Sequence, residues 1–376
     1  MASIHDVAKE AGVSVATVSK VINNYPDVSE KTRKKVNIAI ELLKYQPNVV
    51  ARGLVKRRSW TVGVLLTVPF TNPFVSELLE GIKTALENSG YDLVRLSTRF
   101  DDPAYSFIKH CRSRNVDGVV VFGEGRENTS IQELVEEEIP TMFVDTDLFG
   151  KRAGYITTDN ANGIVMGVKH LHELGHRKIA YISGTLGPAV ANLRLEGYRE
   201  GLRECGIPYS TVYLEVCDYS FDGGSKAARR LLALQDQPTG IVCASDMSAF
   251  GAIHEIEKHG LRVPEDVSVV GFDNTYYAEV FKPGLTTVNQ NIYSIGIKSI
   301  EYLIAMIENP SYTPPSLRNL PIWSCVKRQH RSMNHNPNKT KQNQAQPLAV
   351  LFFLSWICTA LILVGELERT WAILIA

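Results

Sequence analysis

The first 47 residues contain three stretches whose apolar residues recur at helical spacing. The first covers residues 4–11 and ends at Gly12, which readily adopts a left-handed backbone. The second, 15–22, follows Ser14, a residue type favoured as a helix N-cap, and the third covers 30–43. Two short helices joined by a turn containing glycine, with a third to cover them, predict a helix-turn-helix unit.

From residue 60 onward, short apolar runs alternate with longer amphipathic stretches, which is typical of βαβ units around parallel sheets. The expected strands cover 62–68, 92–96, 118–122, 141–144, 178–182, 212–216, 240–244 and 268–272. The expected helices cover 74–86, 162–173, 190–204, 223–234, 248–258 and 292–307. Eight strands over about 270 residues favour two doubly wound lobes over a single sheet.

Composition narrows the class of protein. The 376 residues carry 40 Lys and Arg against 40 Asp and Glu, with 44% hydrophobic residues, which excludes a wholly disordered or multi-spanning chain. The zero net charge conceals an asymmetry, because residues 1–58 carry a net charge of +6 and the remainder −6. A basic module of this kind suggests a polyanionic partner, although a solvated charged face is the alternative.

The six cysteines are scattered without C-x-x-C spacing, and no apolar segment follows a basic start. Both features favour a reducing, cytoplasmic compartment.

In a helix-turn-helix, the second helix enters the major groove and presents its N-terminal residues to base edges. Val15 and Ala16 offer apolar contact to a thymine methyl group, and Lys20 is a donor to guanine or phosphate. Exposed hydroxyl and amide side chains suit phosphate oxygens. The predicted head contacts are Ser14, Val15, Ala16, Thr17, Ser19, Lys20 and Asn23. A small helical protein-interaction domain with the same pattern is the alternative.

At this point the sequence resembles a known family. Ile4-His-Asp-Val-Ala-Lys-Glu-Ala-Gly-Val-Ser-Val-Ala-Thr-Val-Ser-Lys-Val-Ile-Asn23, followed by Val28-Ser-Glu-Lys-Thr-Arg-Lys-Lys-Val36 and Tyr45-Gln-Pro-Asn48, is similar to the DNA-binding head of LacI/GalR-type repressors. The resemblance implies that three residues read bases and three contact the backbone. The base-reading set is Val15, Ala16 and Lys20, and the backbone set is Thr17, Ser19 and Asn23.

Residues 48–56 resemble the hinge helix of that family, which folds on operator DNA and inserts a leucine into the minor groove. Leu54 matches this leucine, whereas Gly53 departs from a good helix former. The predicted linker contacts are Asn48, Arg52, Leu54 and Lys56. The alternative is a flexible basic linker.

The body also resembles the same family, through pieces such as Leu174-Gly-His-Arg-Lys-Ile-Ala-Tyr-Ile182 and Val267-Ser-Val-Val-Gly-Phe-Asp273. The resemblance implies a periplasmic-binding-protein-like body that the chain crosses three times. The predicted parts are a helix-turn-helix head at 1–47, a hinge at 48–58, a two-lobed body at 59–331 with crossings near 158–160, 287–290 and 317–322, and an atypical tail at 332–376.

Ligands of open α/β sheets bind beyond the carboxyl ends of the strands, here between the lobes. Carboxylates, amides, an arginine and aromatic rings at those ends suit a sugar or another polyol. The predicted effector residues are Phe70, Asn72, Phe74, Asp145, Arg194, Tyr219, Phe221, Ser245, Asp246, Asp273 and Gln290. For each aspartate, a helix cap or turn residue is the alternative.

The sequence contains no phosphate-binding loop and no G-x-S-x-G elbow, so we expect neither a nucleotide cofactor nor catalysis. His170, His172 and His176 cluster near a predicted helix end, but Gly175 interrupts the helix and we expect no metal there. The simplest function that accounts for these features is a dimeric DNA-binding regulator. A steep fall of DNA affinity with salt concentration would distinguish it from the alternatives. The alternatives are a solute-binding module and a cleft enzyme that uses Asp145, Asp246 or Asp273 on a sugar.

The tail does not fit this scheme. Residues 348–364 are seventeen residues without a charge, at the lower limit for a membrane-spanning helix. A tail anchor that leaves the body cytoplasmic is one interpretation. We favour the other, a non-native extension, because a repressor has no evident use for such a segment.

Overall fold

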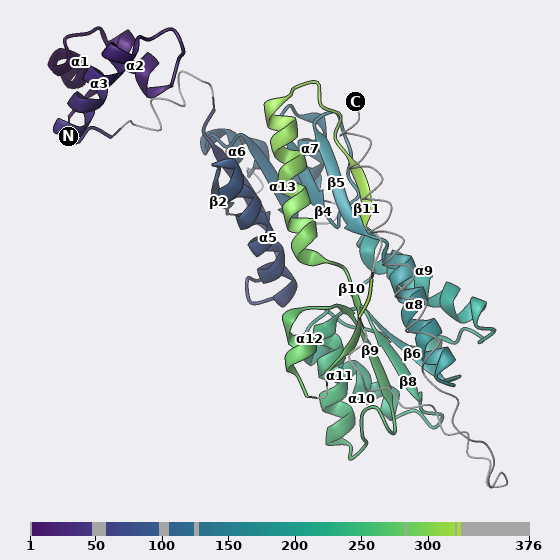
Figure 1. Ribbon diagram of the computed structural model, residues 1–376. Helices are drawn as coiled ribbons and strands as arrows, with labels where there is room; N and C mark the ends of the chain where they lie inside the picture. The colour runs from purple at the N-terminus through teal and green to yellow at the C-terminus, as the bar shows by residue number, and fades with distance from the viewer. Residues whose placement is uncertain are drawn as a thin grey trace, which may run out of the picture. The chain divides into compact units, whose positions relative to one another are not determined.

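The structure is a computed structural model that describes residues 2–46, 58–97, 105–123, 128–282, 284–319 and 322–324. Figure 1 shows a helical head, residues 2–46, and an α/β body that begins at residue 58. The predicted hinge contacts Asn48, Arg52, Leu54 and Lys56 lie outside the described residues, as does the apolar run 348–364.

The head is a three-helix unit, as the sequence predicts. Its helices are α1 (Ile4–Ala11), α2 (Val15–Ile22) and α3 (Glu30–Leu42). Each helix begins after a serine whose side chain accepts a backbone hydrogen bond, and Gly12 ends α1 with a φ of 64°. Val7, Val18 and Val36, one from each helix, are fully buried, so the apolar face of every helix contributes to one small core.

The body contains two six-stranded sheets. The first has the order β11-β5-β4-β3-β1-β2 and the second β12-β10-β9-β8-β6-β7. The strands are β1 (Thr61–Leu66), β2 (Asp92–Leu96), β3 (Gly118–Phe122), β4 (Thr141–Val144), β5 (Ala153–Thr158), β6 (Ile179–Ser183), β7 (Leu214–Val216), β8 (Gly240–Cys243), β9 (Ser268–Asp273), β10 (Thr286–Asn289), β11 (Ser316–Asn319) and β12 (Ile322–Ser324). We call the parts around these sheets the amino-terminal and carboxy-terminal lobes.

Helices cover both faces of each sheet (Figure 1). They are α5 (Pro73–Ser89), α6 (Phe107–Ser113), α7 (Thr129–Glu136), α8 (Asn160–Glu173), α9 (Ala189–Glu204), α10 (Phe221–Leu232), α11 (Asp246–Lys258), α12 (Tyr276–Val280) and α13 (Ile292–Glu308), with a short 3-10 helix at Thr211–Tyr213.

The two sheets repeat one topology. In each lobe the first five strands follow the order 2-1-3-4-5, with the chain reversing direction of travel beside the first strand. The chain passes between the lobes after β5, after β10 and between β11 and β12. The pairings between the named strands are parallel except that of β10 with β12, where Val288 pairs with Trp323 in an antiparallel register.

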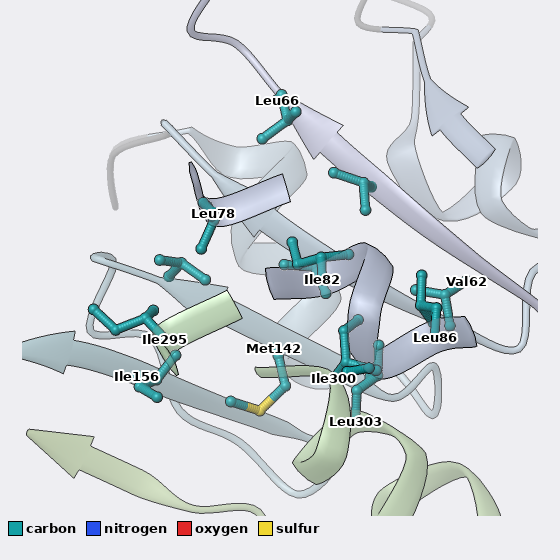
Figure 2. Packing of buried hydrophobic residues seen from close by; sticks show 14 of the residues in the cluster. Val62, Leu66, Leu78, Ile82, Leu86, Met142, Ile156, Ile295, Ile300 and Leu303 are labelled. Atoms are coloured by element: carbon teal, nitrogen blue, oxygen red, sulfur yellow. The ribbon is translucent and has the colours of Figure 1, made fainter. Parts of the chain in front are cut away.

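Buried aliphatic side chains fill the space between the first sheet and the helices α5 and α13 (Figure 2). Leu78 and Ile82 of α5, Ile300 and Leu303 of α13, and Val62 of β1 are each fully buried. Burying side chains of this size stabilises a fold by about 1.5 to 3 kcal/mol each, relative to leaving them exposed.

The sequence pattern located eight of the twelve strands that the structure describes. β5, β10, β11 and β12, and the helices α6, α7 and α12, are absent from the predicted set. The prediction at 212–216 is wrong in its first half, because residues 211–213 form the 3-10 helix.

Candidate functional site

A cavity of about 320 Å³ lies where the carboxyl ends of the strands of both lobes meet. Asp145 follows β4, Tyr219 follows β7, Asp273 ends β9 and Gln290 follows β10. This is the edge at which doubly wound sheets bind ligands, because the loops there diverge on either side of the first strand. The lining residues are Val68, Asn72, Phe74, Phe122, Gly123, Val144, Asp145, Thr146, Pro188, Val190, Arg194, Asp218, Tyr219, Ser245, Met247, Asp273 and Gln290.

One wall of the cavity is aromatic. The rings of Phe74 and Phe122 stack with centroids 5.0 Å apart and an interplanar angle of 15°. Asn72 caps α5 by accepting a 2.9 Å hydrogen bond from the backbone of Phe74, which fixes the start of the helix that carries this ring. A flat apolar wall beside polar groups can hold a ligand with one apolar face and one hydroxylated face.

Arg194 is buried in the opposite wall and is held by two hydrogen bonds. Its Nε donates to Asn160 Oδ1 at 2.7 Å, and its Nη1 donates to the carbonyl oxygen of Ala244 at 2.5 Å. The guanidinium also lies 4.0 Å from the centre of the Phe272 ring. Within the described chain its Nη2 forms no hydrogen bond, so this donor remains for a ligand.

Asp145 is connected to this arginine through two side chains. Thr157 donates to Asp145 Oδ1 at 2.7 Å and accepts from Asn160 Nδ2 at 3.1 Å. Burial raises the pKa of Asp145, while the positive charge of Arg194 and the Thr157 hydrogen bond act in the opposite direction. The backbone of Asp145 has a φ of 59°, a strained conformation for a residue with a side chain.

Two buried carboxyl groups lie on this side of the cavity, with Asp273 in its lining and Asp246 behind it. Asp246 accepts from Thr287 at 2.6 Å and from the backbone and hydroxyl of Thr275 at 2.8 and 3.0 Å. Gln290 donates to Asp273 Oδ1 at 2.6 Å. Burial raises the pKa of Asp246 to about 7 and, together with the neighbouring Asp246 charge, raises the pKa of Asp273 well above its usual range. Each of the two carboxyl groups therefore holds a proton more readily than an exposed aspartate does.

The head presents a second candidate surface on α2. Ala16 is exposed, and the Ser14 hydroxyl accepts from the backbone of Thr17 at 3.1 Å. Lys20 forms an ion pair with Asp27, and Asn23 donates to the carbonyl oxygen of Ser19 at 2.8 Å. These contacts order the exposed side of the helix before any partner binds.

Comparison with known proteins identifies the family. Residues 3–48 match the domain of bacterial regulatory proteins of the lacI family, and residues 168–329 match a periplasmic binding protein-like domain. The chain is 34% identical to catabolite control protein A of Priestia megaterium over 85% of its own length and 96% of that protein. The chain belongs to the LacI family. It is a DNA-binding transcriptional regulator with a periplasmic-binding-protein-like effector domain.

Other relatives agree with this family. The chain is 34% identical to the HTH-type transcriptional repressor PurR of Aliivibrio salmonicida over 82% of this chain and 93% of that one. A lac repressor dimer bound to operator and the anti-inducer ONPF shares 29% identity, with a TM-score of 0.75 over 88% of this chain and 99% of that chain. The transcriptional regulator CelR in complex with cellobiose shares 31% identity, with a TM-score of 0.64 over 86% and 99%. These relatives are regulators and not enzymes.

In this LacI-family chain, the structure brings eight of the eleven predicted effector residues together around the cavity. Phe70 instead is half exposed and lies under the guanidinium of Arg95. Phe221 packs against the second lobe's core beside His254, and Asp246 is fully buried behind Asp273. These three do not line the cavity, and the binding role of the other eight remains a prediction.

Other cavity-lining residues were missed by the sequence argument. Val68, Phe122, Val144, Val190 and Met247 are apolar, so their pattern indicates core rather than a site. Gly123, Thr146, Pro188 and Asp218 also line the cavity. Only the rule that the loops after β1, β3, β4, β6, β7 and β8 converge could have selected them.

Val15 differs from Ala16 in its surroundings. Val15 is partly exposed at the start of α2 and also packs against the head's core, and its predicted contact with a base remains a prediction. Within the described residues, no group of three or more histidines, cysteines or carboxylates is arranged to hold a metal ion. The helices that the structure describes include none with the length and apolar character needed to cross a membrane.

Proposed function

We propose that the chain acts as a dimeric repressor that binds a pseudo-palindromic operator and is controlled by a sugar or a similar uncharged polyol in the interlobe cavity. The observation that carries the proposal is the convergence of Arg194, Asp145, Asp273 and Gln290 on one cavity with an aromatic wall. Carboxylate, amide and guanidinium groups together satisfy several hydroxyls, and the rings cover an apolar sugar face.

In the proposed mechanism, two heads about one helical turn apart read consecutive major grooves. Val15 and Ala16 contact base edges, and Lys20 contacts guanine or a phosphate. The register on the DNA backbone is fixed by Ser14, Thr17, Ser19 and Asn23. The linker residues Asn48, Arg52, Leu54 and Lys56 add contacts at the centre, where Leu54 acts as a minor-groove wedge. Effector binding changes the operator affinity by a coupling of about 1 to 3 kcal/mol.

The first experiment is thermal unfolding of the full chain with cellobiose, ribose, their phosphorylated counterparts and guanine. A ligand that binds only the folded state raises the melting temperature. We expect an uncharged sugar to do so and the Arg194→Ala variant to lose the response. A rise in melting temperature with guanine alone would show that the effector is a purine and not a sugar. An undiminished rise in the Arg194→Ala variant would show that Arg194 does not bind the ligand.

A second experiment measures the affinity of the chain for two DNA duplexes of 20 base pairs. One duplex is selected from a randomised pool for binding to the chain, and the other is unrelated in sequence. Leu54→Ala is expected to weaken binding to the selected duplex far more than to the unrelated one, because only the kinked complex uses the wedge. Equal losses on both duplexes would contradict the wedge assignment. The affinity for either duplex should fall steeply with salt.

We further propose that the chain catalyses no reaction on its effector and acts in the cytoplasm, since its partner is DNA. Recovery of the bound sugar unchanged after long incubation supports the first point, and a cleaved or modified product would overturn it. We propose that the 332–376 tail makes no membrane contact. Flotation of the full chain with lipid vesicles would contradict that.

A further inference from the structure

The first described residues after the linker are fastened to the amino-terminal lobe by one carboxylate. Asp117, in the loop before β3, accepts hydrogen bonds from the backbone nitrogen and hydroxyl of Ser59 at 2.8 and 3.0 Å. Its second oxygen accepts from the backbone nitrogen of Trp60 at 2.9 Å. Trp60 has a φ of 57°, a conformation that a tryptophan keeps only where its surroundings impose it.

A second fastening comes from Arg58. Its Nη2 donates to the carbonyl oxygen of Ile307 at 3.3 Å, and its Nη1 lies 3.8 Å from Glu308 Oε1. The guanidinium also lies 5.8 Å from the centre of the Trp60 ring, which packs against Tyr91. Arg58 therefore binds the carboxyl end of α13, where helix carbonyl groups lack partners within the helix.

The opposite end of α13 lies at the cavity. The helix begins at Ile292, two residues after Gln290, whose amide donates to Asp273. Its 17 residues span about 25 Å at 1.5 Å per residue. Figure 1 shows α13 running alongside α5 in the amino-terminal lobe.

The packing of α13 against α5 leaves little room for independent movement. A methyl group added at Gly296 would lie 2.4 Å from the carbonyl oxygen of Leu78, and one at Gly81 would lie 2.2 Å from that of Tyr293. Figure 2 shows Ile295, Ile300 and Leu303 of α13 among the buried side chains of this core. Close-packed helices move as one body, because such interfaces do not deform continuously.

We propose that Arg58 and Asp117 are positioning residues that clamp the DNA linker to the amino-terminal lobe, and that α13 is a rigid strut between this clamp and the effector cavity. A change at Gln290 then reaches the linker through the helix, and DNA binding reaches the cavity by the same route, since coupling is reciprocal. The inference rests on the proposed function, because α13 can transmit a signal only if DNA binding and ligand binding in the cavity are coupled.

The test measures hydrogen exchange in α13 with and without the selected duplex, in the full chain. In the wild type, DNA is expected to slow exchange in peptides from 292–308, although the head carries the DNA contacts. In Arg58→Ala, binding to unrelated DNA should be unchanged while this protection is lost and affinity for the selected duplex falls about fivefold or more. Arg112→Ala is the matched control, because Arg112 forms an ion pair with Glu137 on the same lobe.

Asp117→Asn provides a second variant. Its amide would place a donor against one of the backbone donors of Ser59 or Trp60, so the clamp opens without loss of volume. Asp266→Asn is its control, because Asp266 likewise accepts three hydrogen bonds, all from Arg262 in the other lobe. Melting temperatures without DNA separate loosening of the clamp from loss of the fold.

Three results would overturn the inference. If DNA still slows exchange in 292–308 in Arg58→Ala or in a folded Asp117→Asn, then Arg58 and Asp117 do not couple the linker to α13. If the wild type binds the selected duplex but exchange in 292–308 is not slowed, α13 does not transmit the effect of DNA binding. The proposed function would still hold. If the wild type binds no duplex from the randomised pool more tightly than the unrelated one, both the inference and the proposed function are contradicted.

Discussion

Asn160 and Arg194 join the first crossing between the lobes to the wall of the interlobe cavity. Asn160 Oδ1 accepts from Arg194 Nε at 2.7 Å, and the Asn160 amide donates to Thr157, which donates to Asp145. One unbroken chain of hydrogen bonds therefore runs from a carboxylate of the amino-terminal lobe to a cation of the carboxy-terminal lobe. Because Asn160 does not line the cavity, we expect a substitution there to act on a ligand only through Arg194.

Asn160→Ala should therefore impair ligand binding without removing a ligand contact. The change leaves the buried Nε of Arg194 without its acceptor, which costs about 1 to 3 kcal/mol. We expect a lower melting temperature and a smaller ligand-induced rise for whichever sugar stabilises the wild type. Asn162→Ala, an exposed asparagine on the same helix, is the control. Equal ligand responses in the two variants would show that Asn160 does not position Arg194.

Asp246→Asn should flatten the pH dependence of stability. The pKa of Asp246 is raised to about 7 in the folded chain by burial, against an ordinary value near 4. The folded state thus holds the proton more tightly, so stability falls as the pH rises from about 4 to about 7. In the variant, the amide can donate to the Thr287 hydroxyl and accept from Thr275. Melting temperatures across this range test the prediction, and an unchanged slope would contradict it.

His176 should produce the opposite trend in the acid range. Burial lowers its pKa to about 4 from an ordinary value near 6.5, and its Nδ1 lies 3.0 Å from the Thr239 hydroxyl. The folded state resists protonation, so its stability is complete above about 6.5 and falls as the pH drops towards 4, by about 3 kcal/mol. His176→Gln, which cannot titrate, should lose less stability over this interval. A decline as steep as that of the wild type would assign the acid sensitivity elsewhere.

Gly296→Ala should destabilise the chain although alanine favours helices. Alanine gains about 1 kcal/mol of helix propensity, but its methyl group would lie 2.4 Å from the carbonyl oxygen of Leu78 and force α13 away from α5. Overpacking of this kind costs about 1 to 3 kcal/mol, or several degrees in melting temperature.

Gly167→Ala in α8 is the matched control for that change. The nearest atoms to its added methyl group are side-chain carbons of Val242 and Val270 at 3.4 Å, an ordinary contact distance. We expect this variant to be neutral or more stable. Destabilisation of equal size in both variants would show that the effect does not depend on the α5–α13 contact.

The sequence by itself determined the local elements and the family. The spacing of apolar residues predicted the three head helices and most helices of the body, because a helix displays its buried face at a fixed period. Long apolar runs predicted β3 and β4 with their observed bounds, because central parallel strands are buried on both faces. The head motif and its resemblance to the LacI family needed no coordinates.

Only the tertiary structure decided what depends on pairing across distance. The strand β5 (Ala153–Thr158) carries two adjacent threonines and no long apolar run, and its pairing with β4 and β11 stabilises it as a strand. Asp273 ends β9 and Asp246 lies shortly after β8, yet only Asp273 lines the cavity, because Thr275 and Thr287 hold Asp246 behind it. Arg58 reaches Ile307 across 249 positions, a contact that no local pattern encodes. Sequence periodicity records which face of an element is buried, whereas the partners of that face are set by the packing of the whole chain.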